Sequence, residues 1–504
     1  IVFLVMSFIK GKLFRFIMLS FLIILNFFQM IHLEYFGLKI YPSEIGLFFD
    51  QLNEVSLVVF DRLHIWLRPL VFTIIPLIIL FFVYIKYSIH TKTHIIANYI
   101  IIFVLLFNPI KILVTNSDFG KHPRLRELDG FSVYAVFSYY IVKMLPAIYF
   151  GQFEHSVSSY KLDIQYNNDF SIKYIILIMG ESVNPYMMSI FEESKPYLIK
   201  DNTPFLNSLK YNKNFMYKIA YASGVFTYVS LPLFFNLSFG TRGLDYVLSK
   251  DQCLFKLANN VGYNTYFISS KPDHYLRNIN YTLCPEYIDK YMTYGDLAAS
   301  QSEAAVDDFL ILDKFKELNL KNEDKFFVVL HMRGSHDPYH LRYPSSIVSE
   351  LSLPKPNDSD SLRIYHYVHT ILYLDKFLKV AFELIYELYD NYIVVFTSDH
   401  GEVLGEDGRW GHVFLHPHVY SVPLLLYTSF NDDQSELIMR RWNKWLNVSH
   451  VNHFDLGISI LKSFGYSILN EYRPSQCVVL GGSLYGRSGY QLLNVNGVSV
   501  SKEN

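Results

Sequence analysis

The chain has 504 residues, about half of them apolar, and a formal net charge of −2. A chain of this length usually holds two domains. Charged residues make up only 18%, below the average of about a quarter, and 40 Tyr and 42 Phe favour a protein attached to a membrane. Because no basic stripe stands out, binding to nucleic acid is not expected.

Cysteine usage gives a weak constraint. Cys253, Cys284 and Cys477 lack the paired spacing of a metal finger and allow at most one disulfide. Cys253 with Cys284 is one candidate pair, but we favour three buried free thiols. The sequence begins with Ile1, so we expect the natural start to lie upstream or to be non-standard.

Three stretches near the beginning are long and apolar enough to cross a bilayer, which takes roughly 20 helical residues. They are residues 14–32, 65–86 and 94–114. Residues 44–60 carry three acidic side chains and fit an interfacial helix better than a span. Residues 131–150, interrupted by a lysine and a proline, fit either reading. We predict an α-helical membrane domain over residues 1–150, with three or five spans, and a linker over 151–165.

Basic residues predict the orientation of this domain. Lys10, Lys12 and Arg15 lie before or at the start of the first span, and Lys86 and Lys92 lie in the link from the second span to the third. The positive-inside rule places both groups in the cytoplasm. Three or five spans then carry everything after about residue 150 to the outer side of the membrane, whereas four would leave it in the cytoplasm.

From about residue 165 the long apolar stretches give way to short ones. These are rich in β-branched and aromatic residues and are followed by polar residues or glycine, as strands buried on both faces are. They are residues 174–179, 264–269, 326–332, 392–398 and 422–427, and helical stretches such as 304–318 and 365–389 lie between them. The alternation predicts an α/β/α sandwich over residues 166–504, with a largely parallel sheet whose ligands bind beyond the carboxyl ends of the strands.

Polar residues that suit a metal follow these predicted strands. In chain order they are Glu181, His336, Asp399, His400 and, a little further along, His412. Carboxylate and imidazole are ligands that suit a catalytic zinc. Each residue also has an ordinary explanation, since acids and Asp-His pairs are common in turns. Their position where this fold binds ligands is what favours a site.

Thr227 is the candidate nucleophile. It precedes an apolar run, and a helix beginning there would direct its N–H groups at an anion. A metal held by Glu181, Asp399 and His400 would lower the pKa of the Thr227 hydroxyl and make it an attacking group. The alternative is that Thr227 simply caps the helix. His336 and His412 are then available to bind a phosphate, to protonate a leaving group or to hold a second metal.

Five segments together resemble a known family. "LIMGES", "ASGVFTYVSLP", "LHMRGSHDPY", "TSDHGEVLGEDGRWGH" and "SVPLLLY" are similar, in this order, to motifs of the sulfatase-like branch of the alkaline phosphatase superfamily, and most of all to those of bacterial phosphoethanolamine transferases of the lipid A type. The resemblance covers roughly residues 170–465. It implies that zinc is held by Glu181, Thr227, Asp399 and His400, with a second zinc at His336 and His412 in some members.

The resemblance also implies a reaction and a location. Phosphatidylethanolamine gives its phosphoethanolamine group to Thr227, which releases diacylglycerol, and an envelope acceptor such as lipid A, the lipopolysaccharide core or another glycan then takes the group. The enzyme would be a multi-pass protein of the bacterial inner membrane with a periplasmic catalytic domain. Glu54 is a weak match to a residue that contacts the donor head group, and a solvated helix face is the alternative.

Departures from the family pattern leave other functions open. Cysteines that flank the nucleophile in many members are replaced here by Ser223 and Leu233, so the acceptor is not assumed to be lipid A. A phosphoglycerol transferase that uses phosphatidylglycerol would have the same threonine nucleophile. A sulfatase-like hydrolase is disfavoured because the segment after Ser230 lacks the arginine of the sulfatase motif. A non-catalytic envelope protein would not need both the nucleophile and the metal ligands.

Overall fold

The chain folds into two compact units. Unit 1 comprises residues 1–154 with 408–410 and 485–488, and unit 2 comprises residues 155–407, 411–484 and 489–504. The computed structural model describes residues 11–36, 39–40, 45, 63–86, 99, 103, 106–107, 109–114, 129–146, 162–168, 170–191, 201–238, 250–273, 275–276, 283–297, 306–351, 353–429, 432–448, 450–469, 476–480, 490–494 and 497–499.

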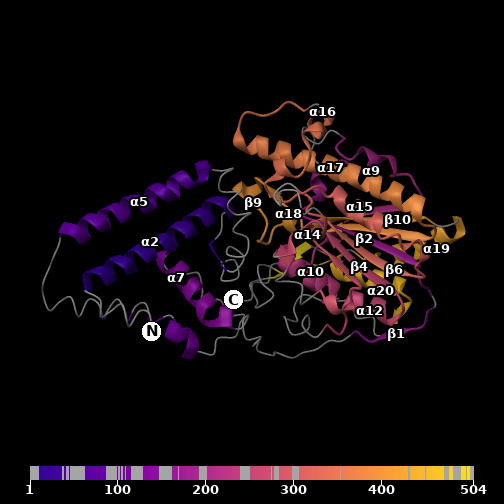
Figure 1. Ribbon diagram of the computed structural model, residues 1–504, viewed down its shortest axis with the longest axis horizontal. Helices are drawn as coiled ribbons and strands as arrows, with labels where there is room; N and C mark the ends of the chain where they lie inside the picture. Colours follow the sequence, from indigo (N-terminus) through magenta and orange to yellow (C-terminus); the bar gives the residue numbers. More distant parts are fainter. Residues whose placement is uncertain are drawn as a thin grey trace. The chain divides into compact units, whose positions relative to one another are not determined.

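Unit 1 is helical wherever it is described at length (Figure 1). Its main elements are α2 (Gly11–Phe36), α5 (Leu63–Lys86) and α7 (Asp129–Tyr139), which runs on into the π-helical turn η1 (Tyr140–Met144). Helix α2 packs against both α5 and α7. Its contact with α7 is apolar, because Met18 and Leu25 lie against Val133 and Tyr134. This unit therefore has a small core of its own.

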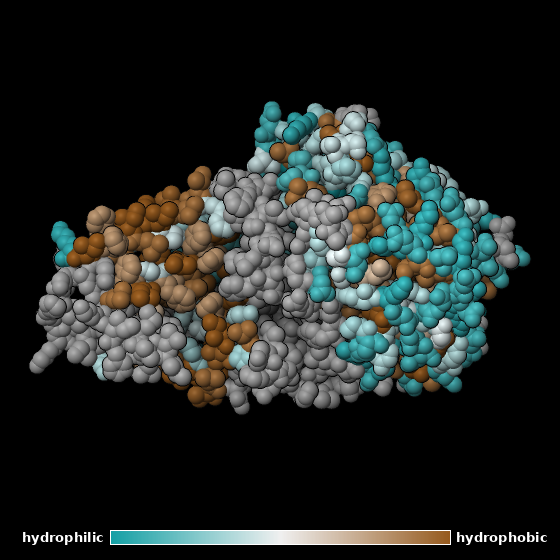
Figure 2. Space-filling model, viewed as in Figure 1, coloured by the Kyte–Doolittle hydropathy of each residue, from teal (hydrophilic) through white to brown (hydrophobic). Residues whose placement is uncertain are grey.

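Two helices of unit 1 have the length and apolar composition of membrane spans, over residues 16–35 and 66–83. The outer surface of α5 is apolar, with Leu67, Phe72, Ile79 and Phe82 all exposed, and Figure 2 shows these helices in brown. An apolar surface of this kind suits lipid rather than water.

These two helices correspond to the first two predicted spans. The third predicted span, 94–114, is helical at each of its described positions but is mostly outside the described residues. The stretch 131–150, which fitted either reading, is helical through residue 146 and contains a shorter apolar helix at Val133–Val142. The stretch 44–60, expected as an interfacial helix, lies almost entirely outside the described residues. The predicted linker, 151–165, is also mostly outside them, so the boundary between the domains stays a prediction.

The centre of unit 2 is a seven-stranded sheet in the order β3-β10-β7-β2-β6-β4-β5. Strands β7, β2, β6, β4 and β5 run parallel, and β10 runs antiparallel to both of its neighbours. The strands are β2 (Tyr174–Gly180), β3 (Phe215–Tyr221), β4 (Asn264–Ser269), β5 (Lys290–Met292), β6 (Phe326–His331), β7 (Tyr392–Ser398) and β10 (Ser421–Ser429). The three central strands β7, β2 and β6 are buried along their whole length, as their continuous apolar runs predict.

Helices cover both faces of this sheet (Figure 1). One face carries α10 (Thr227–Phe235), α12 (Leu254–Asn260), α19 (Asp432–Trp445) and α20 (His453–Ser463), whose apolar side chains share one core cluster with those of the sheet. The other face carries α9 (Pro204–Ser208), α15 (Phe309–Glu317) and α17 (Ser359–Leu388). The α/β/α sandwich predicted from the sequence is therefore present.

The remaining described elements are short. They are η2 (Pro185–Met187), η3 (Pro285–Tyr287), α14 (Tyr294–Leu297), η5 (Leu320–Asn322), η6 (Tyr339–Leu341), η7 (Ser345–Ile347), α16 (Val348–Leu351), η8 (Glu406–Gly408), α18 (Pro417–Tyr420), and strands β1 (Ile164–Tyr166), β8 (Val403–Leu404), β9 (Trp410–Gly411), β11 (Tyr466–Ile468), β12 (Gln476–Leu480), β13 (Tyr490–Asn494) and β14 (Gly497–Ser499).

Some elements differ from the prediction. All five predicted strands form, but β3 and β5 were not predicted, and β10 runs against the sheet. Helix α17 begins at Ser359 rather than at 365, because the side chain of Asp358 accepts a hydrogen bond from the Ser361 N–H and caps the helix there.

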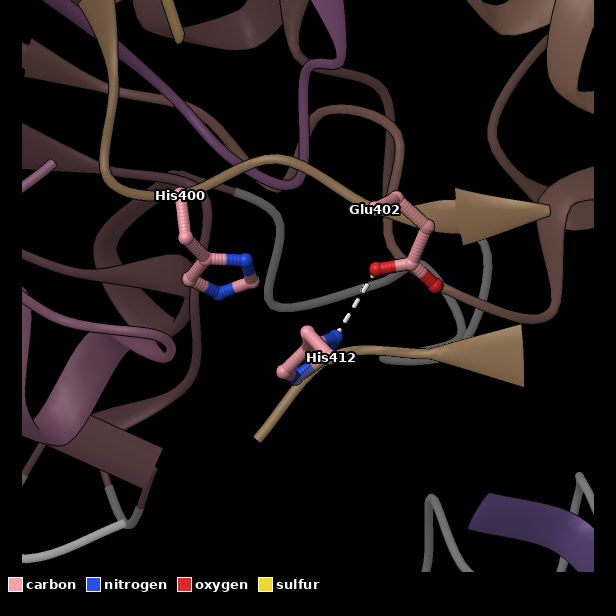
Figure 3. Close-up of side chains that lie close together, drawn as sticks. All are labelled: His400, Glu402 and His412. Carbon is pink, nitrogen blue, oxygen red and sulfur yellow. Dashed lines mark hydrogen bonds and ion pairs between the residues drawn. The ribbon is translucent and has the colours of Figure 1, made fainter. Parts of the chain in front are cut away.

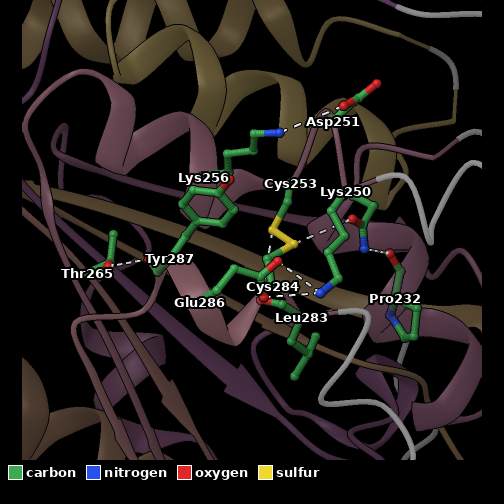
Figure 4. Close-up of a disulfide and its surroundings, with 11 residues drawn as sticks. Pro232, Lys250, Asp251, Cys253, Lys256, Thr265, Leu283, Cys284, Glu286 and Tyr287 are labelled. Atoms are coloured by element: carbon green, nitrogen blue, oxygen red, sulfur yellow. Dashed lines mark hydrogen bonds and ion pairs between the residues drawn. A yellow bond between two sulfur atoms is a disulfide. The ribbon is translucent and has the colours of Figure 1, made fainter.

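The expectation of three free thiols is wrong for two of the cysteines. Cys253 and Cys284 form a disulfide inside the core of unit 2 (Figure 4), and both are fully buried. The bond joins the start of α12 to the turn before η3, and a surface ion pair between Lys250 and Glu286 lies beside it. Sequence spacing did not show that these two segments meet.

Candidate functional site

The carboxyl ends of the neighbouring strands β2 and β7 place three polar side chains together. Gly180 pairs with Ser398 at the end of the two strands, so Glu181 and Asp399 leave the sheet side by side. The ligand atoms of Glu181, Asp399 and His400 all lie within 4.8 Å of one another, and all three side chains are fully buried. Nε2 of His400 lies 3.5 Å from Glu181 Oε1 and 3.4 Å from Asp399 Oδ2.

Thr227 completes this cluster from the first turn of α10. Its hydroxyl donates to Oδ2 of Asp399 at 2.7 Å and lies 3.2 Å from Oε2 of Glu181. The turn that leads into the helix requires a glycine, since a Cβ on Gly224 would lie 2.5 Å from a methyl group of Val229. The four residues singled out as metal ligands in the sequence are therefore neighbours in the fold.

The loops that carry these residues are held by hydrogen bonds. Oδ1 of Asp399 accepts from the N–H of Ser182 at 3.2 Å and from the N–H of His400 at 2.8 Å, which leaves Oδ2 for Thr227. The hydroxyl of Tyr367 donates to the carbonyl of Ser182 at 2.6 Å. Fixed carboxylates of this kind are what a preorganised site needs.

Nδ1 of His400 donates to the carbonyl oxygen of Gly401 at 2.8 Å, so Nε2 is the nitrogen that faces the two carboxylates. Nε2 is buried and makes no hydrogen bond to the described part of the chain. A buried imidazole nitrogen aimed at two carboxylates, with its other nitrogen fixed by a carbonyl, is the arrangement of a metal-binding histidine. The residues present thus fit a zinc ion.

Lys271, which sequence reasoning missed, also reaches this cluster. It comes two residues after β4, its ammonium group pairs with Glu181, and only 2% of its side chain is exposed. The ammonium also lies 4.1 Å above the ring of Tyr275. The signal that could have found it is its place after a predicted strand, which is the criterion that selected Glu181 and Asp399.

The pKa values of the titratable side chains in this cluster are strongly shifted. Burial would raise the pKa of Glu181, but the Lys271 ammonium and the His400 imidazole together hold it well below its usual range. Burial and the nearby Glu181 carboxylate raise the pKa of Asp399 to about 6. Burial opposes the charged form of His400, yet Asp399 and Glu181 raise its pKa to about 9. The ammonium of Lys271 and the imidazole of His400 thus both favour the ionised form of the buried Glu181 carboxylate.

The two remaining predicted histidines line the same site. The ring of His412 lies 4.2 Å from that of His400 and 5.9 Å from that of His336, measured between centroids. Nδ1 of His412 donates to Glu402 at 2.8 Å, as Figure 3 shows. Glu402 is 1% exposed and also accepts from the hydroxyl of Tyr339 at 2.6 Å. His400, Glu402 and His412 form a second group with metal-ligand spacing, which shares His400 with the first.

Comparison with known proteins places the chain in a family. The model of the family described as Sulfatase matches residues 173–466, which carry the whole cluster above. The chain belongs to the sulfatase family.

Among curated relatives, a Kdo(2)-lipid A phosphoethanolamine 7''-transferase of Salmonella typhimurium is 25% identical over 272 residues, or 51% of this chain and 44% of the relative. A phosphoethanolamine transferase EptA of Helicobacter pylori is 21% identical over 317 residues, or 60% of this chain and 56% of the relative. The chain thus spans about half the length of the curated relatives that it matches.

Solved structures support the fold. The integral membrane lipooligosaccharide phosphoethanolamine transferase A of Neisseria meningitidis matches with a TM-score of 0.61 and 16% identity, over 90% of this chain and 85% of that one. The C-terminal periplasmic domain of EptC of Escherichia coli, in a complex with Zn, matches with a TM-score of 0.51 and 19% identity, over 66% of this chain and 96% of that one. At these identities the likeness confirms the predicted fold of a sulfatase-family domain joined to apolar helices.

The candidate site residues predicted from the sequence of this sulfatase-family chain differ in where the structure places them. Glu181, Thr227, Asp399 and His400 lie together, and His336 and His412 lie beside them. Glu54 lies outside the described residues. Glu402 was missed, although it stands in the motif that carries Asp399 and His400; its burial and its bond to His412 appear only in the folded chain.

Proposed function

We propose that this protein is a metal-dependent phosphoethanolamine transferase. It takes phosphoethanolamine from phosphatidylethanolamine and passes it to an acceptor in the bacterial cell envelope through a phosphothreonine at Thr227. The observation that carries this proposal is the buried Thr227 hydroxyl, hydrogen-bonded to Asp399 in the middle of a zinc-type ligand set. Curated relatives named as phosphoethanolamine transferases support the same reaction class.

Glu181, Thr227, Asp399 and His400 would hold one zinc ion. When bound, the ion would supply the positive charge that lowers the pKa of the Thr227 hydroxyl. The buried carboxylates of Glu181 and Asp399 and the Nε2 atom of His400 suit that ion by ligand type and by spacing. We include in this proposal a second zinc ion near His336 and His412, whose rings lie 5.9 Å apart.

The first half-reaction follows from the contacts of Thr227. Its oxygen attacks the phosphorus of the donor, the bond from phosphorus to the diacylglycerol oxygen breaks, and the hydroxyl proton leaves along the bond to Asp399. Either His412, fixed by Glu402, or the nearby His336 would give one proton to the departing oxygen. The ammonium of Lys271, which pairs with Glu181, would lie close to the negative phosphoryl oxygens.

The second half-reaction uses the same groups in reverse. A hydroxyl or phosphate oxygen of the acceptor attacks the phosphorus of the phosphothreonine, the bond to the Thr227 oxygen breaks, and the proton returns to Thr227. One of the two histidines would take the proton of an attacking hydroxyl. Lipid A and other envelope glycans are the acceptors that the relatives suggest.

The donor lipid explains why apolar helices accompany this domain. A lipid head group is within reach of a soluble site only if that site stays next to the bilayer, and the two candidate spans of unit 1 would hold it there. We propose a multi-pass inner-membrane protein, with residues 1–150 in the membrane and residues 166–504 in the periplasm.

Mass spectrometry of envelope lipids and glycans tests this function. A bacterial host that expresses the full chain is compared with the same host carrying the Thr227→Ala variant, and purified protein is digested to find a modified Thr227 peptide. A mass gain of phosphoethanolamine, present only with the unchanged chain, supports the proposal. A gain of phosphoglycerol instead would show that the donor is phosphatidylglycerol. No change on any lipid, glycan or Thr227 peptide would overturn the proposal that the protein is a transferase.

A further inference from the structure

The buried imidazole of His453 links the helix that carries Thr227 to the strand that leads to Asp399. His453 is the first residue of α20 and is fully buried. Its Nδ1 atom lies 3.2 Å from the hydroxyl of Ser230 and 3.4 Å from the backbone N–H of Ser223. Its Nε2 atom lies 3.0 Å from the carbonyl oxygen of Ser398. One ring therefore touches both sides of the site.

The partners of His453 determine where its proton lies. A carbonyl oxygen only accepts, so Nε2 carries the hydrogen and donates it to Ser398. Nδ1 is then bare and accepts from the Ser223 N–H and the Ser230 hydroxyl. Burial lowers the pKa of His453 to about 3, so the ring is neutral in this arrangement. A side chain that lacks either the donor or the acceptor cannot make both connections.

The two ends of this connection lie next to the reacting groups. Ser230 is one helical turn after Thr227 in α10. Ser398 immediately precedes Asp399, and its own hydroxyl accepts from the N–H of Val183 at 3.0 Å and donates to the carbonyl of His400 at 2.8 Å. A shift at Ser398 would therefore reach the loops after β2 and β7 together.

The N-terminus of α20 is a firm anchor for this ring. Asn452 and Asp455 form a reciprocal capping box at the start of the helix. The segment just before it is tied to the end of β3, because the N–H of Tyr221 donates to the carbonyl of Val451 at 2.8 Å. Helix α20 also packs closely on the residues that follow α10, since a Cβ on Gly457 would lie 2.6 Å from a methyl group of Leu237.

We infer that His453 is a positioning residue, which holds the Thr227 hydroxyl against Asp399 by bonding α10 and β7 to one ring. This inference rests on the proposed function. It matters because Thr227 begins a helix and Asp399 follows a strand, so no ladder of the sheet joins them, and the ring of His453 adds a connection between the two elements beside their 2.7 Å hydrogen bond. A displacement of about 1 Å at reacting atoms can cost on the order of 10²-fold in rate.

Two substitutions separate the hydrogen bonds from the packing. His453→Phe keeps the planar ring and loses the hydrogen bonds to Ser223, Ser230 and Ser398, whereas His453→Gln keeps a donor and an acceptor on a side chain of similar reach. Leu456→Ala is the matched control, because this fully buried side chain lies one turn further along α20 and its loss weakens packing without removing a polar contact. All variants are made in the full-length chain.

The measurement is the single-turnover rate of phosphothreonine formation with vesicles of phosphatidylethanolamine, normalised to the folded fraction from thermal unfolding. We expect His453→Phe to slow this step by on the order of 10²-fold with KM for the donor nearly unchanged. His453→Gln should recover most of that loss, and Leu456→Ala should react at the normal rate per folded molecule.

The outcomes distinguish the inference from the proposed function. If the unchanged protein forms no phosphothreonine, the proposed function fails. If it does, and His453→Phe reacts equally fast per folded molecule or His453→Gln is as slow as His453→Phe, only the positioning role fails. Should His453→Phe not fold, Ser230→Ala removes one bond from the helix side and should slow the step by about tenfold; an unchanged rate would overturn the inference.

Discussion

The hydroxyl of Thr227 donates a hydrogen bond of 2.7 Å to Oδ2 of Asp399, although 172 residues separate the two in the chain. Oδ1 of the same carboxylate is fully engaged by two backbone N–H groups. The acid therefore cannot rotate away from the threonine without breaking two other bonds. The proposed nucleophile and its proposed proton acceptor are thus oriented before any substrate arrives.

Replacing Thr227 tests this relationship directly. Thr227→Ala should lower transfer by more than about 10³-fold, because the alanine lacks the oxygen that is proposed to attack the phosphorus. Thr227→Ser should keep measurable transfer, since it keeps the hydroxyl at the same position of α10. Lipid mass spectrometry gives the activity, and thermal unfolding gives the fold. Equal activity of Thr227→Ala and the unchanged protein would remove the mechanism.

Lys271 should substitute electrostatically for the metal. Lys271→Met leaves the buried carboxylates of Glu181 and Asp399 without their nearest ammonium, and breaking a buried pair costs about 3–5 kcal/mol. In zinc-free buffer the variant should unfold at a lower temperature than the unchanged protein, and added zinc should narrow the gap, because the ion supplies the missing charge.

Lys256→Met serves as the control for Lys271, because that lysine faces Asp251 at 3.8 Å near the surface. Its unfolding temperature should not depend on zinc more than that of the unchanged protein. A gap for Lys271→Met that stays the same at every zinc concentration would show that the lysine does not balance the charge of the site.

The sequence was a good guide to the fold because the strands of unit 2 are short apolar runs that cannot be solvent-exposed. It was a poorer guide to the direction of each strand and to which segments pack against one another. An apolar run such as 422–427 reads the same whether the strand runs with or against the sheet, so the antiparallel β10 was not predicted. Cys253 and Cys284 meet because a helix start and a turn pack together, which spacing does not encode.

The same limit applies to the site. Glu181, Asp399 and His400 were accessible to sequence reasoning because acids and imidazoles directly after strands are suited to metals. Lys271 occupies an equivalent position, but a lysine after a strand has no such specific chemistry, and its contact with Glu181 requires the adjacent order of β4, β6 and β2. A role for Glu402 is indicated only by its hydrogen bond to His412, which the sequence does not show.

Gly334 should be indispensable for the position of Glu181. Its φ is +55°, and an added Cβ would lie 2.8 Å from the carbonyl oxygen and 2.9 Å from the nitrogen of Glu181. Gly334→Ala should therefore push Glu181 out of place, lower the zinc content of the purified protein and destabilise it by about 1–3 kcal/mol. Gly295→Ala is the control, since no atom of the described residues lies within 4 Å of its added Cβ. Full zinc occupancy in Gly334→Ala would contradict this account.

The disulfide should stabilise unit 2 without taking part in the reaction. It closes a loop of 31 residues, and the double variant Cys253→Ala with Cys284→Ala should lose about 3–4 kcal/mol of unfolding free energy. Transfer per folded molecule should not change. Reductant should lower the unfolding temperature of the unchanged protein toward that of the double variant; a reductant-insensitive temperature would mean that the bond contributes nothing.

His331 should make the fold sensitive to acid. The side chain is fully buried at the end of β6, Nδ1 lies 2.9 Å from the hydroxyl of Ser269, and burial together with Lys271 lowers the pKa to about 3. In the unfolded chain the histidine binds a proton near its ordinary pKa of about 6.5, so between about pH 6.5 and 3 only the unfolded state is protonated there. Stability must then fall as the pH falls, by up to about 1.4 kcal/mol per pH unit for this group. His331→Gln removes the proton site, so the drop in unfolding temperature from pH 7 to pH 5 should be smaller than in the unchanged protein. An identical drop in both proteins would show that His331 does not carry this sensitivity.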